Sequence, residues 1–180
     1  MQQATDGIFL SQAKYLKKIL KKYGMEYCKP VSTPMVTRCN LSSHDDSPMV
    51  NQPEYRSMIG SLLYLTGTRP EIMHAVGIVG RFQDNPKESH LQAAKRIFKY
   101  LQGTQDFGLW YPKNVDLTLH TYTDADWAGN IDDRKSTSGG EFYMGPRLVS
   151  WFSKNKVLFP YLKQKKNMWL PHHVAHNSFG

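Results

Sequence analysis

The sequence predicts an α+β fold in which a helical region precedes a small antiparallel β-sheet. Apolar residues recur at helical spacing in four segments before residue 105, and each segment is bounded by capping residues, proline or glycine. After residue 107, apolar and polar residues alternate with period two, and β-branched and aromatic side chains are frequent. Helices followed by a run of strands are typical of the α+β class.

The first helix is expected over Gln12–Tyr23, after a short strand at Gly7–Leu10. Ser11 can cap this helix and Gly24 can end it. Its apolar stripe consists of Ala13, Leu16, Ile19, Leu20 and Tyr23. The remaining surface carries Lys14, Lys17, Lys18, Lys21 and Lys22. These lysines are either a face that follows a phosphate backbone or an ordinary solvated helix surface.

Three more helices are expected, over Glu54–Thr66, Pro70–Gln83 and Leu91–Leu101. Ser89 is the expected N-cap of the last helix, and Gly103 closes it. Outside its apolar stripe, that helix carries a second basic group, Lys95, Arg96 and Lys99.

Between the first helix and the other three, Thr37–Pro53 is polar and has no periodicity, which predicts an exposed linker. Two strands are expected downstream, at Phe107–Tyr111 and Leu117–Thr123. They can pair as a hairpin through the intervening Pro112-Lys113-Asn114, although the second strand need not take the first as its partner.

The second of these strands leads into Asp124 and Asp126, which are two residues apart and therefore share one face of an extended backbone. Neighbouring carboxylates repel each other and are suited to sharing Mg²⁺ or Mn²⁺. The pair is either half of a metal site for phosphodiester chemistry or the end of a strand in an Asp-rich turn.

Composition limits the choice of partners. Lys and Arg number 23 against 15 acidic residues, giving a net charge of +8, which suits a polyanion. The two cysteines, Cys28 and Cys39, indicate neither a disulfide framework nor a zinc finger. No apolar run is long enough to span a bilayer, and the N-terminus has no signal-peptide pattern. We expect an intracellular protein, cytoplasmic or nuclear and not secreted, with no membrane or small-molecule partner.

Longer motifs narrow the function. The block Tyr122–Gly129, followed by Asp132–Gly140, Phe142–Gly145 and Leu148–Lys154, resembles the ribonuclease H region of copia-type LTR retrotransposon Pol polyproteins. Upstream blocks extend the resemblance over nearly all of positions 6–154. They include Asp6–Gln12, Lys29–Met35, Gly60–Thr66, Thr68–Pro70 and Ala93–Arg96.

The resemblance implies a domain order. Residues 1–36 would be the C-terminal end of the reverse transcriptase region, 37–53 a linker, 54–111 the helical connection region, and 112–154 an incomplete ribonuclease H-like antiparallel sheet. Residues 155–180 would be an aberrant tail.

Three of the family's five ribonuclease H strands are expected in this chain, so one sheet edge should stay open. The apolar side of that sheet, including Trp151 and Phe152, would be covered by the upstream helices or by the tail. Marginal stability and poor solubility are the expected consequences.

The resemblance also implies which catalytic parts are missing. The family's polymerase motif, Tyr-x-Asp-Asp, does not occur, so we expect no polymerisation by this chain alone. Ribonuclease H chemistry uses several carboxylates to hold two metal ions. Asp124 matches the first of them as a vestigial catalytic and metal ligand, with Asp126 as an additional candidate, but no acidic residue occurs in 155–180. Glu141 departs from the family pattern and is interpreted as a surface substitution.

We explain the sequence of the tail by the hypothesis of a frameshift. When plausible codons for Lys154–Phe179 are read one nucleotide out of register, they can spell the family's missing glutamate-bearing block in the right order. Asn167–Leu170, for example, can then encode Tyr-Val-Ala, and His173–His176 can encode Cys-Cys-Thr.

Three functions remain open. The leading hypothesis is an inactive Pol remnant that retains affinity for RNA–DNA hybrid or RNA, through Lys14, Lys17, Lys18, Lys21, Lys95, Arg96 and Lys99. The alternatives are a Mg²⁺-dependent nuclease that uses Asp124, Asp126 and Glu141, and an interaction module without enzymatic activity. Mg²⁺ would be needed only for the nuclease.

Overall fold

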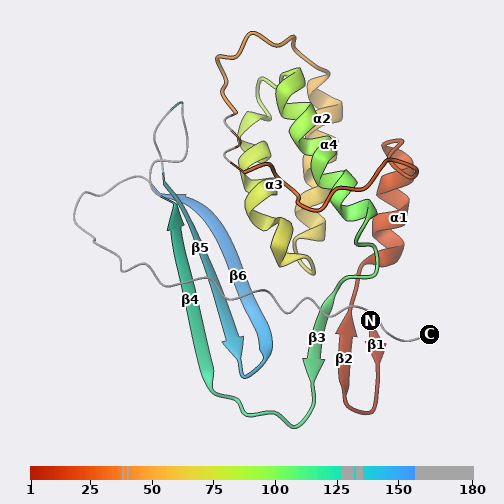
Figure 1. Ribbon diagram of the computed structural model, residues 1–180, viewed down its shortest axis with the longest axis vertical. Coiled ribbons are helices and arrows are strands. Elements are labelled where there is room, and N and C mark those ends of the chain that lie inside the picture. Colours follow the sequence, from red (N-terminus) through yellow and green to blue (C-terminus); the bar gives the residue numbers. More distant parts are fainter. Residues whose placement is uncertain (38, 40, 127–131, 133–135, 157–180) are drawn as a thin grey trace.

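The computed structural model describes residues 1–37, 39, 41–126, 132 and 136–156 (Figure 1). Helices gather at one end of the molecule, and two three-stranded antiparallel sheets extend from them. The mixed α+β class predicted from the sequence is therefore confirmed. Among the residues so described, no helix is long and apolar enough to cross a membrane.

Four helices form the core, close to their predicted positions: α1 (Ala13–Lys22), α2 (Gln52–Leu65), α3 (Met73–Val79) and α4 (Glu88–Gln102). Large apolar side chains from all four pack into one buried cluster, for which Leu16, Leu62, Val76 and Phe98 are representative. The Tyr55 hydroxyl donates to the backbone oxygen of Val79 at 2.7 Å, so this buried polar group is satisfied inside the cluster.

The two later helices differ from the predictions in detail. The expected helix Pro70–Gln83 is divided into a 3₁₀ turn at Pro70–Ile72, α3, and a second 3₁₀ turn at Gly80–Phe82. The expected N-cap at Ser89 is wrong, because α4 already begins at Glu88 and Ser89 lies within it.

The reason for the early start of α4 is a side chain that reaches back along the chain. His90 Nδ1 accepts a hydrogen bond from the backbone N–H of Lys87 at 3.0 Å, so His90 satisfies one of the unpaired donors at this helix end.

The first sheet, in the order β1–β2–β3, comprises β1 (Gln2–Gln3), β2 (Gly7–Leu10) and β3 (Leu109–Pro112). Of the two alternatives left open by the sequence, the hairpin is excluded, because β3 pairs with β2 near the N-terminus rather than with the next strand along the chain. A Cβ atom at Gly7 would overlap the ring of Trp110. The small residue thus allows the indole to pack directly over β2 and favours this long-range pairing.

The second sheet, in the order β4–β5–β6, comprises β4 (Leu119–Asp126), β5 (Ser136–Met144) and β6 (Arg147–Lys156). Trp151 Nε1 donates to the backbone oxygen of Thr66 at 2.9 Å, and a guanidinium N–H of Arg81 donates to Thr137 Oγ1 at 2.8 Å. The upstream helices therefore contact one face of this sheet, as predicted.

Trp151 and Phe152 do not share that face, which corrects the expectation that they lie on one apolar side. Successive residues of a strand point to opposite faces. Trp151 reaches the helical half, whereas Phe152 lies over Gly140 and beside Phe142, with 6.3 Å between the two ring centroids. The sheet therefore carries aromatic side chains on both faces.

Candidate functional site

The lysine face of α1 is one of the predicted sites. Leu16, Ile19 and Leu20 turn into the core, so the lysines of the helix point outwards. Lys14, Lys17, Lys18 and Lys21 are all exposed. Lys22 is also exposed, but its Nζ donates to Ser57 Oγ at 2.9 Å and lies 4.8 Å from the centroid of the Tyr23 ring. The four other lysines thus form a cationic surface on the outside of the helical half.

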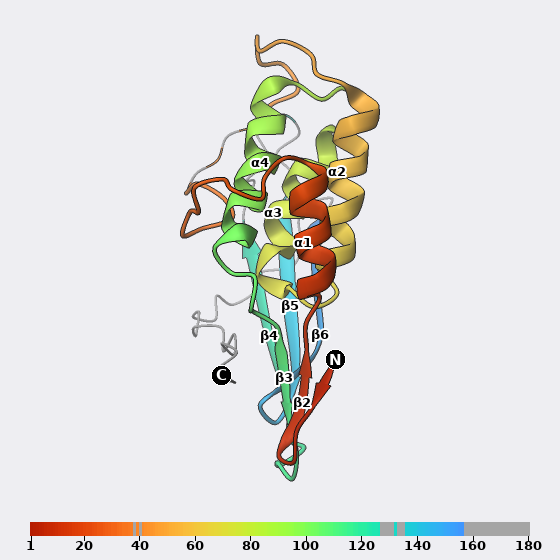
Figure 2. The same cartoon turned by 90° about the vertical axis from the view of Figure 1, so that its right-hand side faces the viewer.

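The basic residues of α4 are in a different environment, because Lys95, Arg96 and Lys99 are only half exposed. The chain that follows α1 runs across α4 (Figures 1 and 2). Arg96 donates to Thr33 Oγ1 of that chain at 3.0 Å. The structure therefore separates the predicted basic residues into an open group on α1 and a partly covered group on α4.

The two cysteines lie in the chain that crosses α4. Burial raises the pKa of Cys28, although the charge of Lys99 acts in the opposite direction. Burial likewise raises the pKa of Cys39 against the opposing charge of Arg96. Both side chains behave as protonated packing groups at neutral pH rather than as reactive thiolates.

The acidic site lies on β4. Asp124 is exposed and stands opposite Gly139 of β5, while Asp126 stands opposite Thr137. The two aspartates therefore occupy alternate positions of one strand. Glu141 pairs with Tyr122, so it shares the face of Asp124 and lies diagonal to it.

The Glu141 side chain accepts a hydrogen bond within its own strand. The Tyr143 hydroxyl donates to Glu141 Oε2 at 2.9 Å, and Tyr143 lies farther along β5 than Glu141. Burial, together with the hydrogen bond to Glu141 and its charge, raises the pKa of Tyr143. The phenol therefore stays protonated and holds the carboxylate in this position.

Mg²⁺ prefers several oxygen ligands in octahedral geometry and retains water molecules. The exposed carboxylate of Asp124 can supply one such ligand. Within the described ranges, no cluster of three or more His, Cys, Asp or Glu residues is arranged to hold a metal.

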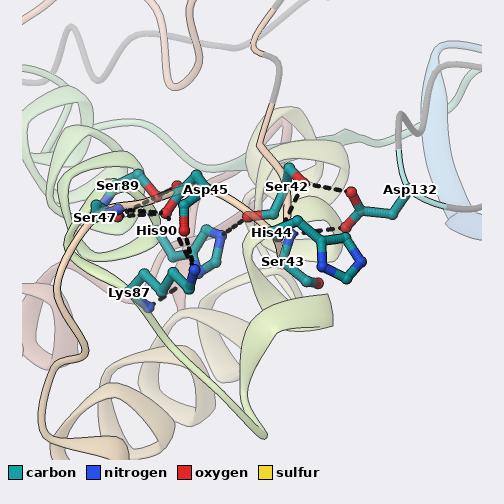
Figure 3. Close-up of polar contacts among 9 residues, drawn as sticks. All are labelled: Ser42, Ser43, His44, Asp45, Ser47, Lys87, Ser89, His90 and Asp132. Carbon is teal, nitrogen blue, oxygen red and sulfur yellow. Dashed lines mark hydrogen bonds and ion pairs between the residues drawn. The ribbon is translucent and has the colours of Figure 1, made fainter.

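The sequence analysis missed a polar cluster at the start of α4, formed by Ser42, Ser43, His44, Asp45, Ser47, Lys87, Ser89, His90 and Asp132 (Figure 3). Asp45 accepts from Ser47 Oγ at 2.6 Å and from the Ser89 hydroxyl, and it lies 3.7 Å from Lys87 Nζ. The hydrogen bonds from Ser47 and Ser89 lower the pKa of Asp45 to about 2. This carboxylate joins the chain before α2 to the start of α4.

His90 is the buried centre of the polar cluster. Because Nδ1 accepts from the Lys87 N–H, Nε2 carries the proton and donates to the backbone oxygen of Ser42 at 3.0 Å. The ring stacks on Phe82 with 3.8 Å between centroids. Burial lowers the pKa of His90, so the neutral ring is favoured.

Asp132 connects the polar cluster to the second sheet. Its carboxylate accepts from Ser42 Oγ at 2.5 Å and from the Ser43 N–H at 2.8 Å, and these bonds lower the pKa of Asp132. The only sequence signal was indirect: serine and aspartate at 42–47 are typical of turns that bind their own backbone.

Curated proteins resemble the chain over most of its length. It is 44% identical to the Retrovirus-related Pol polyprotein from transposon RE1 of Arabidopsis thaliana over 150 residues, which are 83% of this chain and 10% of that protein. For transposon RE2 of the same plant, the identity is 40% over 86% of the chain and 11% of the protein. For transposon TNT 1-94 of Nicotiana tabacum, it is 42% over 85% of the chain and 12% of the protein.

The chain belongs to the copia-type retrotransposon Pol family. This Pol segment spans about a tenth of the length of the RE1 and RE2 polyproteins. No family model matches it, and no solved structure is a significant match. The proposed domain boundaries stay predictions, and the frameshift concerns a tail that, beyond residue 156, lies outside the described residues.

Proposed function

We propose that this transposon-derived Pol segment binds nucleic acid without sequence preference and does not hydrolyse it. The observation that carries the proposal is the α1 face, on which Lys14, Lys17, Lys18 and Lys21 are exposed side by side on a rigid helix. Lysine acts on phosphate as a point charge and reads no base sequence, so such a face provides backbone contacts alone. RNA–DNA hybrid and RNA are the proposed ligands.

The half-covered group on α4 has a smaller part in this function. Arg96 is already hydrogen-bonded to Thr33, so binding a phosphate through its guanidinium would compete with an internal contact. Lys95 and Lys99 lie one helical turn apart on the same face and can contribute long-range attraction.

We assign the sheet β4–β6 to a ribonuclease H-like unit on the strength of the Tyr122–Gly129 block at the end of β4. The lack of hydrolysis is argued from the carboxylates. In-line displacement with two metals needs both ions held 3.5–4 Å apart, according to the general mechanism. Glu141 already accepts a hydrogen bond from Tyr143, and residues 155–180 of the sequence carry no acidic side chain.

A second candidate is a Mg²⁺-dependent nuclease that uses Asp124, Asp126 and Glu141, which is favoured by the placement of Asp124 and Glu141 on one face of the sheet. Incubating the purified chain with labelled RNA–DNA hybrid and Mg²⁺ decides between the two functions. We expect no cleavage. Mg²⁺-dependent cleavage that disappears in Asp124→Asn would establish the nuclease instead.

Binding is tested by titrating labelled RNA–DNA hybrid at several salt concentrations. The triple variant Lys14→Gln, Lys18→Gln and Lys21→Gln should weaken binding about tenfold or more near 0.1 M salt. The logarithmic salt slope should become shallower by up to about 3, because fewer counterions are released.

The matched control removes the same charge elsewhere. Lys29, Lys113 and Lys154 are also exposed, and their triple replacement by glutamine leaves the α1 face intact. We expect this control to bind clearly more tightly than the α1 variant. Equal losses in the two variants would show that net charge alone attracts nucleic acid, and the α1 assignment would be wrong.

A further inference from the structure

The outer edge of β4 is not paired by any other described strand, since the sheet order is β4–β5–β6. The strand is eight residues long and pairs regularly with β5 from Leu119 to Asp126. Its side chains from Leu119 to Asp124 are all exposed. Natural edge strands are commonly blunted by proline, lysine, a bulge or short length. β4 contains neither proline nor lysine and has a regular register, so its edge can accept another strand.

The side chains of β4 are complementary to themselves in the antiparallel direction. His120, Tyr122 and Asp124 occupy alternate positions and share one face. If two copies of β4 pair about a two-fold axis centred on Tyr122, His120 of each copy stands opposite Asp124 of the other. The symmetry therefore makes this favourable pair twice.

The remaining positions agree with the same register. The two Tyr122 rings face each other at the axis, and Thr121 of each copy stands opposite Thr123 of the other on the second face. Aromatic pairs and threonine pairs are both favourable across strands. Centring the pairing on Thr123 instead would place His120 opposite Asp126 and Asp124 opposite Tyr122, so substitutions at Asp124 distinguish the two registers.

We propose that a second copy of this chain binds along β4. The β4–β6 sheets of the two copies then form one continuous antiparallel sheet of six strands. The occupant is identified by the charge pattern, because an edge that carries His120 and Asp124 at equal distances from Tyr122 is complementary to its own copy. This interaction is independent of the α1 surface and of nucleic-acid binding.

The test is sedimentation equilibrium of the full 180-residue chain over a wide concentration range. We expect a monomer–dimer equilibrium. His120→Asp places a like charge opposite each of the two Asp124 residues in the dimer. This should weaken association about tenfold or more. Asp124→Lys should weaken it similarly, and the double variant His120→Asp, Asp124→Lys should restore association to within about threefold of the original, because the charges are exchanged.

A matched control adds the same negative charge to an edge strand of the other sheet. Gln3→Asp lies on β1, is exposed, and should leave the dimer constant unchanged. A chain that stays monomeric up to about 1 mM would overturn the proposal, because a dissociation constant of 1 mM corresponds to a dimerisation free energy of only about 4 kcal/mol.

Two further results would also contradict the proposal. One is a dimer whose dissociation constant is unchanged by both single substitutions or is not restored by the double variant. The other is a monomer whose β4 amides resist hydrogen exchange at every concentration, which would show that the edge is covered within one chain. Protection of the β4 amides that increases with concentration supports self-pairing.

Discussion

The helical half and the sheet β4–β6 differ in how completely they bury their apolar side chains. In the helical half, α1–α4 enclose a shared core in which residues such as Ile59, Leu62 and Phe98 are fully buried. On β4 of the sheet, by contrast, Leu119 is 63% exposed and Tyr122 is 43% exposed. The helices are therefore stabilised mainly by their own packing, whereas the sheet depends on contacts with α3 and with the segment that precedes α3.

The largest effect should come from truncating the helical core. Leu62→Ala removes a fully buried side chain and should lower the free energy of unfolding by about 2–5 kcal/mol, because a cavity remains. The same truncation at the exposed Leu119 should cost about 0.5 kcal/mol or less. Urea denaturation of the two variants measures the difference, and similar losses would refute the contrast between the two regions.

A smaller effect is expected where the two regions meet. Trp151→Phe keeps an aromatic ring but removes the donor to the Thr66 oxygen, so unfolding should become easier by about 1 kcal/mol. Tyr122→Phe, which also alters an aromatic residue of this sheet, serves as the control. If Trp151→Phe is as stable as the control, the indole hydrogen bond does not hold the sheet to the helices.

Near neutral pH the free energy of unfolding should depend only weakly on protonation of the polar cluster. On acidification this dependence should become measurable. The pKa of His90 is lower in the folded state than in the unfolded chain, so protonation favours unfolding as the pH falls below about 6.5. Asp45 acts in a lower range, because its pKa falls from 3.8 to about 2 on folding. Its stabilising contribution is present above pH 3.8 and is lost as the pH falls towards 2.

The two pH ranges can be separated by substitution. In urea denaturation at a series of pH values, His90→Gln should flatten the dependence below about pH 6.5, and Asp45→Asn should flatten the one between about pH 4 and 2. An unchanged profile in either variant would show that the corresponding group does not link folding to protons.

The smallest effect is expected at the surface ion pair between Arg56 and Asp84, which are 2.8 Å apart with side chains 49% and 96% exposed. Exposed pairs contribute about 0.2–1 kcal/mol, and salt screens them. Asp84→Asn should therefore change the free energy of unfolding only marginally, and less so in high salt. A loss comparable to that of Leu62→Ala would show that surface charge rather than core packing stabilises this half.

Local pattern was sufficient for much of the fold. The apolar stripe over Gln12–Tyr23 correctly predicted both the helix and its outward lysines, because the 3.6-residue period is a local property. Period-two alternation likewise predicted the strand that leads into Asp124, which is β4. These features need no information from distant parts of the chain.

Features that depend on distant residues were not predicted. The partner of β3 is β2, about a hundred residues away, where Trp110 packs closely over Gly7. The polar cluster joins Ser42 to Asp132 and to His90, and no local period reports such contacts. The partial cover over Arg96 has the same origin, because Thr33 approaches it through tertiary packing.

The most direct test of the contrast between the two regions is native-state hydrogen exchange of the full chain, measured at low concentration and resolved by segment. The backbone amides in the middle of α2 and α4 should exchange through global unfolding and be the slowest. The outward amides of β4 should exchange far faster, through local opening or directly to solvent. If the β4 amides were as slow as those of α2 under these conditions, the sheet would be as closed as the helical core, and the account would be contradicted.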